Sequence, residues 1–310
     1  MKNLLLATTA LVVTAGAAAA EVAFSGYARF GVKYIEDREV SSGSFVDLDG
    51  DGVAETEVFE KEETFVTSRY RLNIDIMTET DGGVNLEARV RMQASDGGAA
   101  TLNGARFSAS AGGLRMDLGN IAGAIDNMPN YYGYEIGLTD FLGQYNGNDY
   151  SFDAYDSSGT GQKNAVYAAY TFGAFQLLGS YSDDSVDDEQ TSVAIAYSGD
   201  AFGVAFGWAN DDTQGDLFVL TGNYDFGTFD LVGFYSNADD VGGDAWGMSA
   251  DIEVGAATSV QLAYGDGDGD DSEAYGIGFK HNLGGGAFLR GGVGQSDDTT
   301  IADLGVRFDF

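Results

Sequence analysis

The sequence predicts an all-β fold, namely a 16-stranded antiparallel transmembrane β-barrel with a long constriction loop folded into its pore. Three observations lead to this prediction. Apolar residues alternate with polar or small ones along most of the chain, short turns alternate with long loops, and an export leader stands in front. Alternation with a period of two is typical of strands with one apolar face. Beyond the leader, no apolar run is long enough for a membrane-spanning helix.

Residues 1–20 have the features of a secretory signal peptide. Lys2 gives a positive start, an apolar stretch follows, and Ala18–Ala20 form a small-residue cleavage site. Such a segment is too short to be a spanning helix. We therefore expect an exported mature chain, residues 21–310, with 14 basic and 49 acidic residues and a formal net charge of −35. This charge argues against nucleic-acid binding, and the absence of cysteine excludes disulfides and thiol chemistry.

Sixteen segments of the mature chain show the strand pattern. Most are regular, but in 228–237 the apolar residues Val232 and Phe234 occupy the polar parity. The predicted strands lie near 22–34, 64–78, 84–95, 102–111, 114–119, 164–172, 174–182, 191–198, 201–210, 216–225, 228–237, 244–254, 258–265, 273–283, 286–296 and 300–310.

The connections between these segments alternate in length. One set is short and rich in glycine, as at Gly112–Gly113 and Gly284–Gly286, whereas the other is mostly longer and acidic, as at 35–63 and 183–190. Outer-membrane barrels have short turns at one rim and long loops at the other. A soluble sandwich would not sort its loops in this way. An even number of antiparallel strands also closes the sheet, so that no unpaired edge faces lipid.

Aromatic residues stand at the ends of many predicted strands. Rings in this position form the two interfacial girdles of a membrane barrel. The residues concerned are Tyr170, Phe172, Tyr181, Tyr197, Tyr224, Tyr235 and Tyr264. The last strand also ends in an aromatic residue, Phe310, as outer-membrane proteins do. We therefore expect the chain in the outer membrane of a Gram-negative bacterium, in contact with its lipid and lipopolysaccharide.

Three segments resemble one family, the general diffusion porins of alphaproteobacteria of the Rhodobacter type. Glu21–Val32 resembles their opening strand, Tyr134–Asp140 their constriction loop and Ala302–Phe310 their closing strand. The resemblance implies a homotrimer of 16-stranded barrels, each with a water-filled pore narrowed by the third long loop. It also implies passive passage of small hydrophilic solutes and ions.

The outward faces differ around the predicted barrel. The first strands present small residues, namely Gly26, Ala28, Ala88, Ala105, Ala109 and Ala111. Later strands present larger groups such as Phe206 and Trp246. Small residues let backbones approach closely, so we expect the first wall to meet neighbouring subunits.

The loop at 120–163 and the arginines before it are the candidate functional residues. The loop has no basic residue before Lys163, and it carries Asp126, Glu135 and Asp140. The arginines occupy the polar parity of their strands and are Arg29, Arg69, Arg71, Arg89, Arg91, Arg106 and Arg115. If the loop folds inward, acids and arginines would set up a transverse field at the narrowest point. The alternatives are a loop lying over the outer rim and arginines that are merely solvated.

A second candidate site lies in the first long loop. Asp47, Asp49 and Asp51 followed by Glu55 have the spacing of oxygen ligands in a calcium loop. However, Val58 stands where a bidentate glutamate would complete the set. The alternative is a solvated acidic loop. We therefore expect no required cofactor, with Ca²⁺ as the one candidate.

The single histidine and the balance of charges bear on the remaining function classes. We expect no enzymatic activity, because His281 is the only histidine and a catalytic triad would depend on it. Two alternatives to a general diffusion channel stay open: a solute-specific channel whose arginines guide anions, and a calcium-binding adhesive barrel that does not conduct. The net charge favours cations and the seven arginines oppose this locally, and on balance we expect a preference for cations.

Overall fold

The computed structural model describes residues 20–46, 55–152, 155, 165–183, 189–238, 240–269 and 272–310. Its regular structure in these ranges consists of strands. They are β1 (Glu21–Ile35), β2 (Glu39–Val46), β3 (Glu55–Glu60), β4 (Thr64–Glu79), β5 (Asn85–Ser95), β6 (Thr101–Leu102), β7 (Arg106–Ala111), β8 (Leu114–Gly119), β9 (Ala165–Phe172), β10 (Phe175–Asp183), β11 (Glu189–Ser198), β12 (Phe202–Asp211), β13 (Gly215–Asp225), β14 (Phe229–Ala238), β15 (Gly243–Gly255), β16 (Thr258–Gly267), β17 (Ala274–Gly284), β18 (Ala287–Ser296) and β19 (Thr299–Asp309). No helix in the described ranges is long and apolar enough to cross a membrane.

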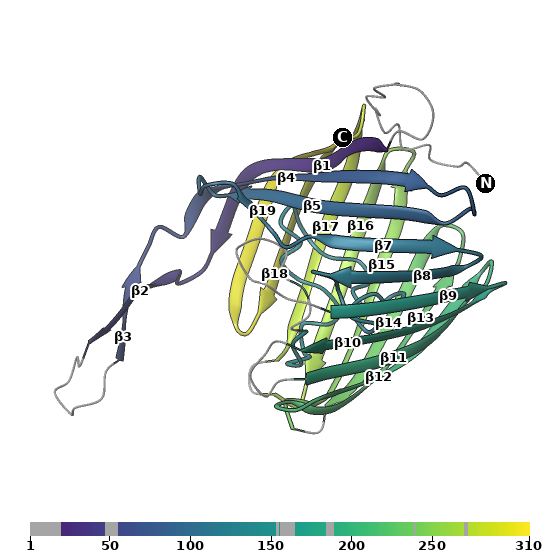
Figure 1. Cartoon of the computed structure of the whole chain (residues 1–310). Helices are drawn as coiled ribbons and strands as arrows, with labels where there is room; N and C mark the ends of the chain where they lie inside the picture. Colours follow the sequence, from purple (N-terminus) through teal and green to yellow (C-terminus); the bar gives the residue numbers. More distant parts are fainter. Residues whose placement is uncertain are drawn as a thin grey trace.

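The sheet closes on itself. Each barrel strand pairs antiparallel with its neighbours, and β1 pairs with both β4 and β19. Gly26 N donates to Phe310 O at 2.8 Å, and Phe310 N donates to Gly26 O at 3.0 Å, so the terminal residue completes the seam. Strands of the near wall cross those of the far wall because all are tilted (Figure 1). The prediction of a 16-stranded antiparallel barrel is confirmed, with β6 and β7 counting as one interrupted strand.

The interruption between β6 and β7 is a β-bulge. Met92 pairs with Leu102 whereas Arg89 pairs with Arg106, so the second strand carries one extra residue. A bulge of this kind reverses which side chains face inward. As a result Leu102 and Phe107 both face outward, 57% and 56% exposed, despite their odd spacing.

The first long connection is not a plain loop, because β2 and β3 pair as a two-stranded sheet outside the barrel. Their register runs from Glu39 opposite Glu60 to Val46 opposite Glu55. The hairpin projects from the rim opposite the short turns (Figure 1). Those turns are tight: Gly112 and Gly113, between β7 and β8, have φ of 57° and 86°, a conformation that favours glycine.

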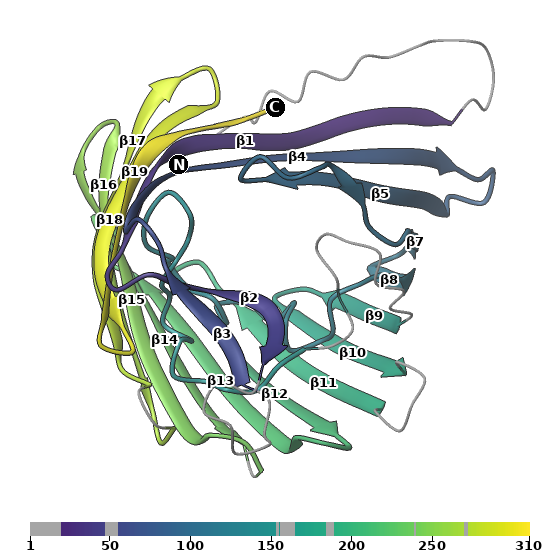
Figure 2. The same cartoon turned by 90° about the vertical axis from the view of Figure 1, so that its left-hand side faces the viewer.

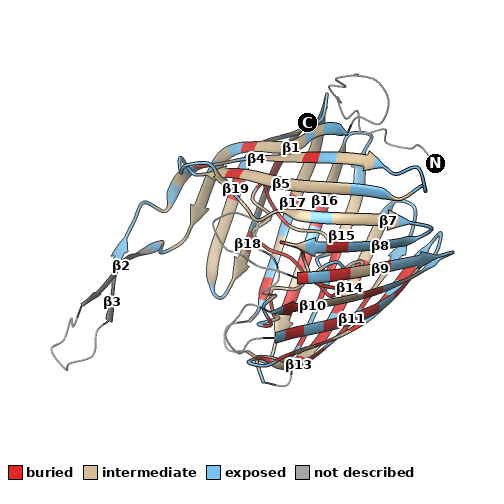
Figure 3. Ribbon diagram, viewed as in Figure 1, coloured by how far each residue is buried: buried red, intermediate tan, exposed pale blue. Residues whose placement is uncertain are grey.

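The outward and inward faces of the strands are clearly different. Large apolar residues such as Phe206, Ile277 and Leu304 are nearly half exposed, because only lipid would cover them. The predicted strand-end rings face the same way, and Phe172 stacks between Tyr170 and Phe175 at the short-turn rim. Inward residues are buried mainly on β9–β16 and only partly on β1, β4 and β5 (Figure 3). Something therefore covers the inner wall on one side only.

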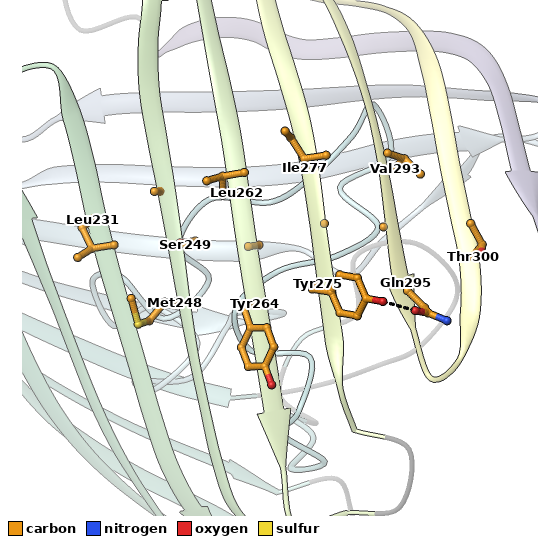
Figure 4. A pocket seen from close by; sticks show the side chains of 14 residues that line it. Leu231, Met248, Ser249, Leu262, Tyr264, Tyr275, Ile277, Val293, Gln295 and Thr300 are labelled. Atoms are coloured by element: carbon orange, nitrogen blue, oxygen red, sulfur yellow. Dashed lines mark hydrogen bonds between the residues drawn. The ribbon is translucent and has the colours of Figure 1, made fainter.

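The outer face also carries an apolar groove of about 690 Å³ across β14–β18. Met248, Leu262, Ile277 and Val293 line it (Figure 4). The Tyr275 hydroxyl donates to Gln295 at its end. These are outward side chains, so the groove belongs to the lipid-facing belt and not to the pore.

We expect Phe206→Arg to lower the free energy of unfolding in lipid by about 2–4 kcal/mol, because it buries a charge on the lipid face. Denaturant titration in vesicles measures the change. Phe206→Leu is the control, since it keeps the site apolar. Equal stability of the two variants would show that this face does not contact lipid.

Candidate functional site

The chain that follows β8 turns into the barrel instead of crossing its rim. Residues 120–152 run along the inner wall and then turn back, which explains the one-sided burial (Figure 2). Hydrogen bonds between the loop and four strands, β10, β13, β15 and β19, fix the path of the loop. They join Ala124 N to Ser180 Oγ (2.8 Å), Thr221 Oγ1 to Pro129 O (2.7 Å), Tyr134 N to Ser249 Oγ (2.8 Å) and Leu138 N to Asp303 Oδ1 (2.8 Å).

Glycines on the inner wall let the loop approach closely. Leu138 packs on Gly31 and Gly305, where β1 meets β19. A Cβ at Gly247 on β15 would overlap the carbonyl oxygen of Gln144, which is itself fully buried. Side chains at these positions would therefore displace the loop.

Apolar residues on the inner wall also serve the loop. Val232 and Phe234, the two residues that break the polar parity of β14, are each only 4% exposed. The Phe234 ring meets Tyr131 of the loop edge-to-face, with centroids 5.2 Å apart. The irregularity in the sequence is thus where the loop packs, and not a fault in the strand.

An arginine cluster holds the tip of the loop. The Asp140 carboxylate lies 2.7 Å from Arg290 and 3.3 Å from Arg29, with Arg307 at 3.9 Å. Arg29 also donates to Leu138 O at 3.1 Å. Of the three arginines, only Arg29 was expected here. Arg290 and Arg307 also occupy inward positions of their strands, and this is the sequence signal that could have identified them. Closure of the barrel then brings β18 and β19 beside β1.

Asp303 on β19 is a second anchor that the sequence analysis missed. Its carboxylate accepts hydrogen bonds from the backbone N–H of Leu138 (2.8 Å) and of Thr139 (2.7 Å), and from Thr139 Oγ1 (2.8 Å). A carboxylate that accepts three bonds fixes a backbone segment firmly. Asp140 follows directly with φ of 54°, which is uncommon for a residue other than glycine.

Glu135 lies on the same part of the loop as Asp140. The Tyr145 hydroxyl donates to its carboxylate at 2.8 Å. Burial and the charge of Asp140 raise the pKa of Glu135, while Arg290 and Arg29 act against this rise. Of the seven expected arginines, Arg29 therefore lies with Glu135 and Asp140, and Arg290 from β18 joins it.

Asp126 lies apart from the ion pairs of Asp140. It lies among tyrosines near the start of the loop, where the Tyr132 hydroxyl donates to it. Burial alone raises the pKa of its carboxyl to about 6. Within the described part of the chain, no basic side chain forms an ion pair with it.

The seven predicted arginines all lie on the inward face. Arg29 meets Asp140, and the other six fall into two groups. Arg89, Arg106 and Arg115 pair with the strand acids Asp75, Glu87 and Asp117. The arginines of β4 and of the adjoining part of β5 donate instead to neutral groups: Arg69 to Ser95 (3.2 Å), Arg71 to Gln93 (2.7 Å) and Arg91 to Asn73 (3.0 Å). Arg91 also lies 5.4 Å from the centroid of the Tyr155 ring. Fewer of these arginines are therefore free of an acidic partner than the sequence suggested.

The candidate calcium ligands belong to the first long connection. Asp47, Asp49 and Asp51 lie outside the described residues, and so does the side chain of Glu55, the first residue of β3. Among the side chains that are described, no group of three or more acidic or histidine residues is arranged to hold a metal ion. The calcium loop stays a prediction.

We expect Gly247→Val to loosen the loop without opening the barrel, because the new side chain would overlap the backbone of Gln144. Overpacking costs about 1–3 kcal/mol, so cleavage of the loop by chymotrypsin should accelerate about tenfold. Gly233→Val on the next strand is the control, since a Cβ there meets open space. Equal protection of both variants would contradict the packing described here.

Comparison with known proteins agrees with this geometry. A family model described as Gram-negative porin matches residues 7–300. A porin of Fuscovulum blasticum is 32% identical over 316 aligned residues, covering 94% of this chain and 100% of the relative. A porin of Rhodobacter capsulatus is 29% identical and covers 79% and 93%. A solved variant of Rhodopseudomonas blastica porin superposes with a TM-score of 0.80 at 28% identity, covering 93% and 100%. The chain therefore belongs to the Gram-negative porin family and is a general diffusion porin of the outer membrane.

Proposed function

We propose that residues 120–152 form the constriction through which small hydrophilic solutes and ions pass. The position of this loop inside the barrel carries the proposal, because a segment held against the inner wall narrows the lumen along its whole length. The anchors at Asp140 and Asp303 support a fixed constriction in place of a mobile plug. Membership of the porin family establishes that the barrel is a channel. The loop would determine which solutes pass through it.

Charges along this constriction would act on the passing solutes. Arg69, Arg71 and Arg91 face the lumen, and no acidic side chain of the described residues pairs with them. The loop contributes the carboxylates Glu135 and Asp126. Opposed charges in a confined, low-dielectric space create a transverse field. Such a field orients dipolar solutes and hinders apolar ones, which would have to displace ordered water.

The same charges support a preference for cations. The net charge of −35 over residues 21–310 attracts cations to the mouth of the pore. Strand acids neutralise three of the seven predicted arginines, which weakens the local opposition. The balance at the constriction would then favour cations modestly.

The proposal also covers assembly. Membership of the family supports an oligomer, and we propose that it is a homotrimer. The outward face of β1, β5 and β7 places the small residues Ala28, Ala88 and Ala109 among exposed rings such as Phe30 (55%) and Phe107 (56%). Small residues between rings let the side chains of a neighbouring barrel interdigitate, so we place the contacts of a homotrimer on this first wall. The remaining outer face would meet lipid and lipopolysaccharide.

We expect Arg91→Gln to raise the cation-to-anion permeability ratio by about two- to fivefold, because a unit charge within a few ångströms of a passing ion is worth on the order of 1 kcal/mol. Reversal potentials under a salt gradient in planar bilayers measure the ratio. Arg38→Gln, on the first long connection, is the charge-matched control. A shift toward anions in Arg91→Gln would contradict the proposed field.

Selectivity should also depend on pH. The raised pKa of Asp126, about 6, and that of Glu135 mean that these carboxylates take up protons before ordinary surface acids as the pH falls. We therefore expect cation preference to decline between pH 7.5 and pH 5, and Asp126→Asn to remove the part of the decline near pH 6. Asp200→Asn, in an exposed short turn, should leave the profile unchanged. A flat profile in the wild type would contradict this assignment.

A further inference from the structure

A cavity of about 360 Å³ lies on the open side of the loop, apart from the arginine cluster at the tip. Aromatic side chains, one carboxylate and the neutral polar residues Asn148 and Ser151 form its lining. The residues that matter are Tyr131, Tyr132, Tyr145, Tyr150, Phe152 and Asp126. Tyr131 is 2% exposed and packs on Phe234 of the wall, whereas the adjacent Tyr132 is 36% exposed, so the cavity opens on the side away from the wall.

Contacts within the loop hold the rings of this cavity in place. Tyr132 meets Tyr131 and Tyr145 edge-to-face, with centroids 5.0 and 4.9 Å apart. The Tyr131 hydroxyl accepts a hydrogen bond from Asn148 at 2.6 Å, and the Tyr145 hydroxyl donates to Glu135 at 2.8 Å. These bonds fix the ring planes before any ligand arrives, which limits the entropy lost on binding.

The carboxylate of Asp126 is the charged group among the residues that line this cavity. The Tyr132 hydroxyl donates to it, and no lysine or arginine of the described residues forms an ion pair with it. A partly buried carboxylate without a cation is poorly stabilised by its surroundings. A positive ligand would therefore gain both from the carboxylate and from the faces of the rings.

We propose that this cavity is a binding site for small organic cations, meaning ammonium groups that carry apolar substituents. The electron-rich faces of tyrosine attract such cations, and their weak hydration lets them exchange water for aromatic contact. Inorganic cations hold their water more firmly and would pass by. The inference rests on the proposed function, because it needs the loop to line the conducting pore. A ligand in the cavity then narrows the pore and reduces the current in a saturable way.

The test titrates choline into single channels in a planar bilayer. We expect a saturable fall in conductance with choline and none with 3,3-dimethylbutanol, a neutral molecule of nearly the same shape. Asp126→Asn should raise the half-blocking concentration about tenfold, and Tyr132→Leu severalfold, because each removes one of the two sources of attraction. Asp200→Asn makes the same change in net charge at an exposed turn that does not line the cavity, and should block like the wild type.

Equilibrium dialysis of choline against the purified wild-type protein gives a second readout that does not depend on any variant assembling. Saturable uptake that the neutral molecule does not compete for supports the site. Block that is linear in concentration, or equal in Asp126→Asn and wild type, overturns it. Stable ohmic conductance without choline tests the channel itself, so failure of the cavity and failure of the proposed constriction give different results.

Discussion

The close approach of the loop backbone to the inner wall is the constraint on which the pore depends. A barrel of 16 strands is too wide to be filled by its own side chains. Here the chain fills part of the lumen with residues 120–152, and it can do so because the wall offers glycine at Gly31, Gly247 and Gly305. Where the wall is not glycine, it presents apolar residues such as Phe234. One half of the barrel therefore has a packed interior, while the other stays polar and open.

Electrostatics fixes the tip of this loop. Asp140 meets Arg29 and Arg290, which are both at most 10% exposed. Removing one partner of such a buried ion pair would leave an uncompensated buried charge, which is strongly destabilising. Asp303 holds the backbone beside it. The charges nearest the tip are thus used for structure. The charges left for passing solutes are those of Arg69, Arg71 and Arg91 and of the loop carboxylates.

Much of the fold follows from the sequence alone. Alternation with a period of two gave the strands, because lipid on one face and water on the other leave little freedom of register. The inward course of the loop followed from its length and its lack of bases. The bulge between β6 and β7 was not predicted, although the odd spacing of the outward residues Leu102 and Phe107 marks it in the sequence.

The site was less predictable for a physical reason. Charge and parity show that a residue faces inward, but not which neighbour it meets across the closed barrel. Arg290 and Arg307 reach Asp140 only because β19 closes on β1. Asp126 accepts a hydrogen bond from Tyr132, a partner that its charge alone does not predict. Asp75 and Glu87 were overlooked as partners because cross-strand pairs depend on register, whereas Asp117 lies two residues from Arg115 on the same strand.

A disulfide between loop and wall tests the central claim most directly. The chain has no cysteine, so Thr139→Cys combined with Asp303→Cys creates a single pair, at positions whose side chains are hydrogen-bonded at 2.8 Å. If the loop rests on the wall as described, the pair oxidises in the folded protein and the oxidised channel conducts like the wild type. Failure to form the bond, or a conductance that differs from the wild type only when the bond is formed, would contradict the account.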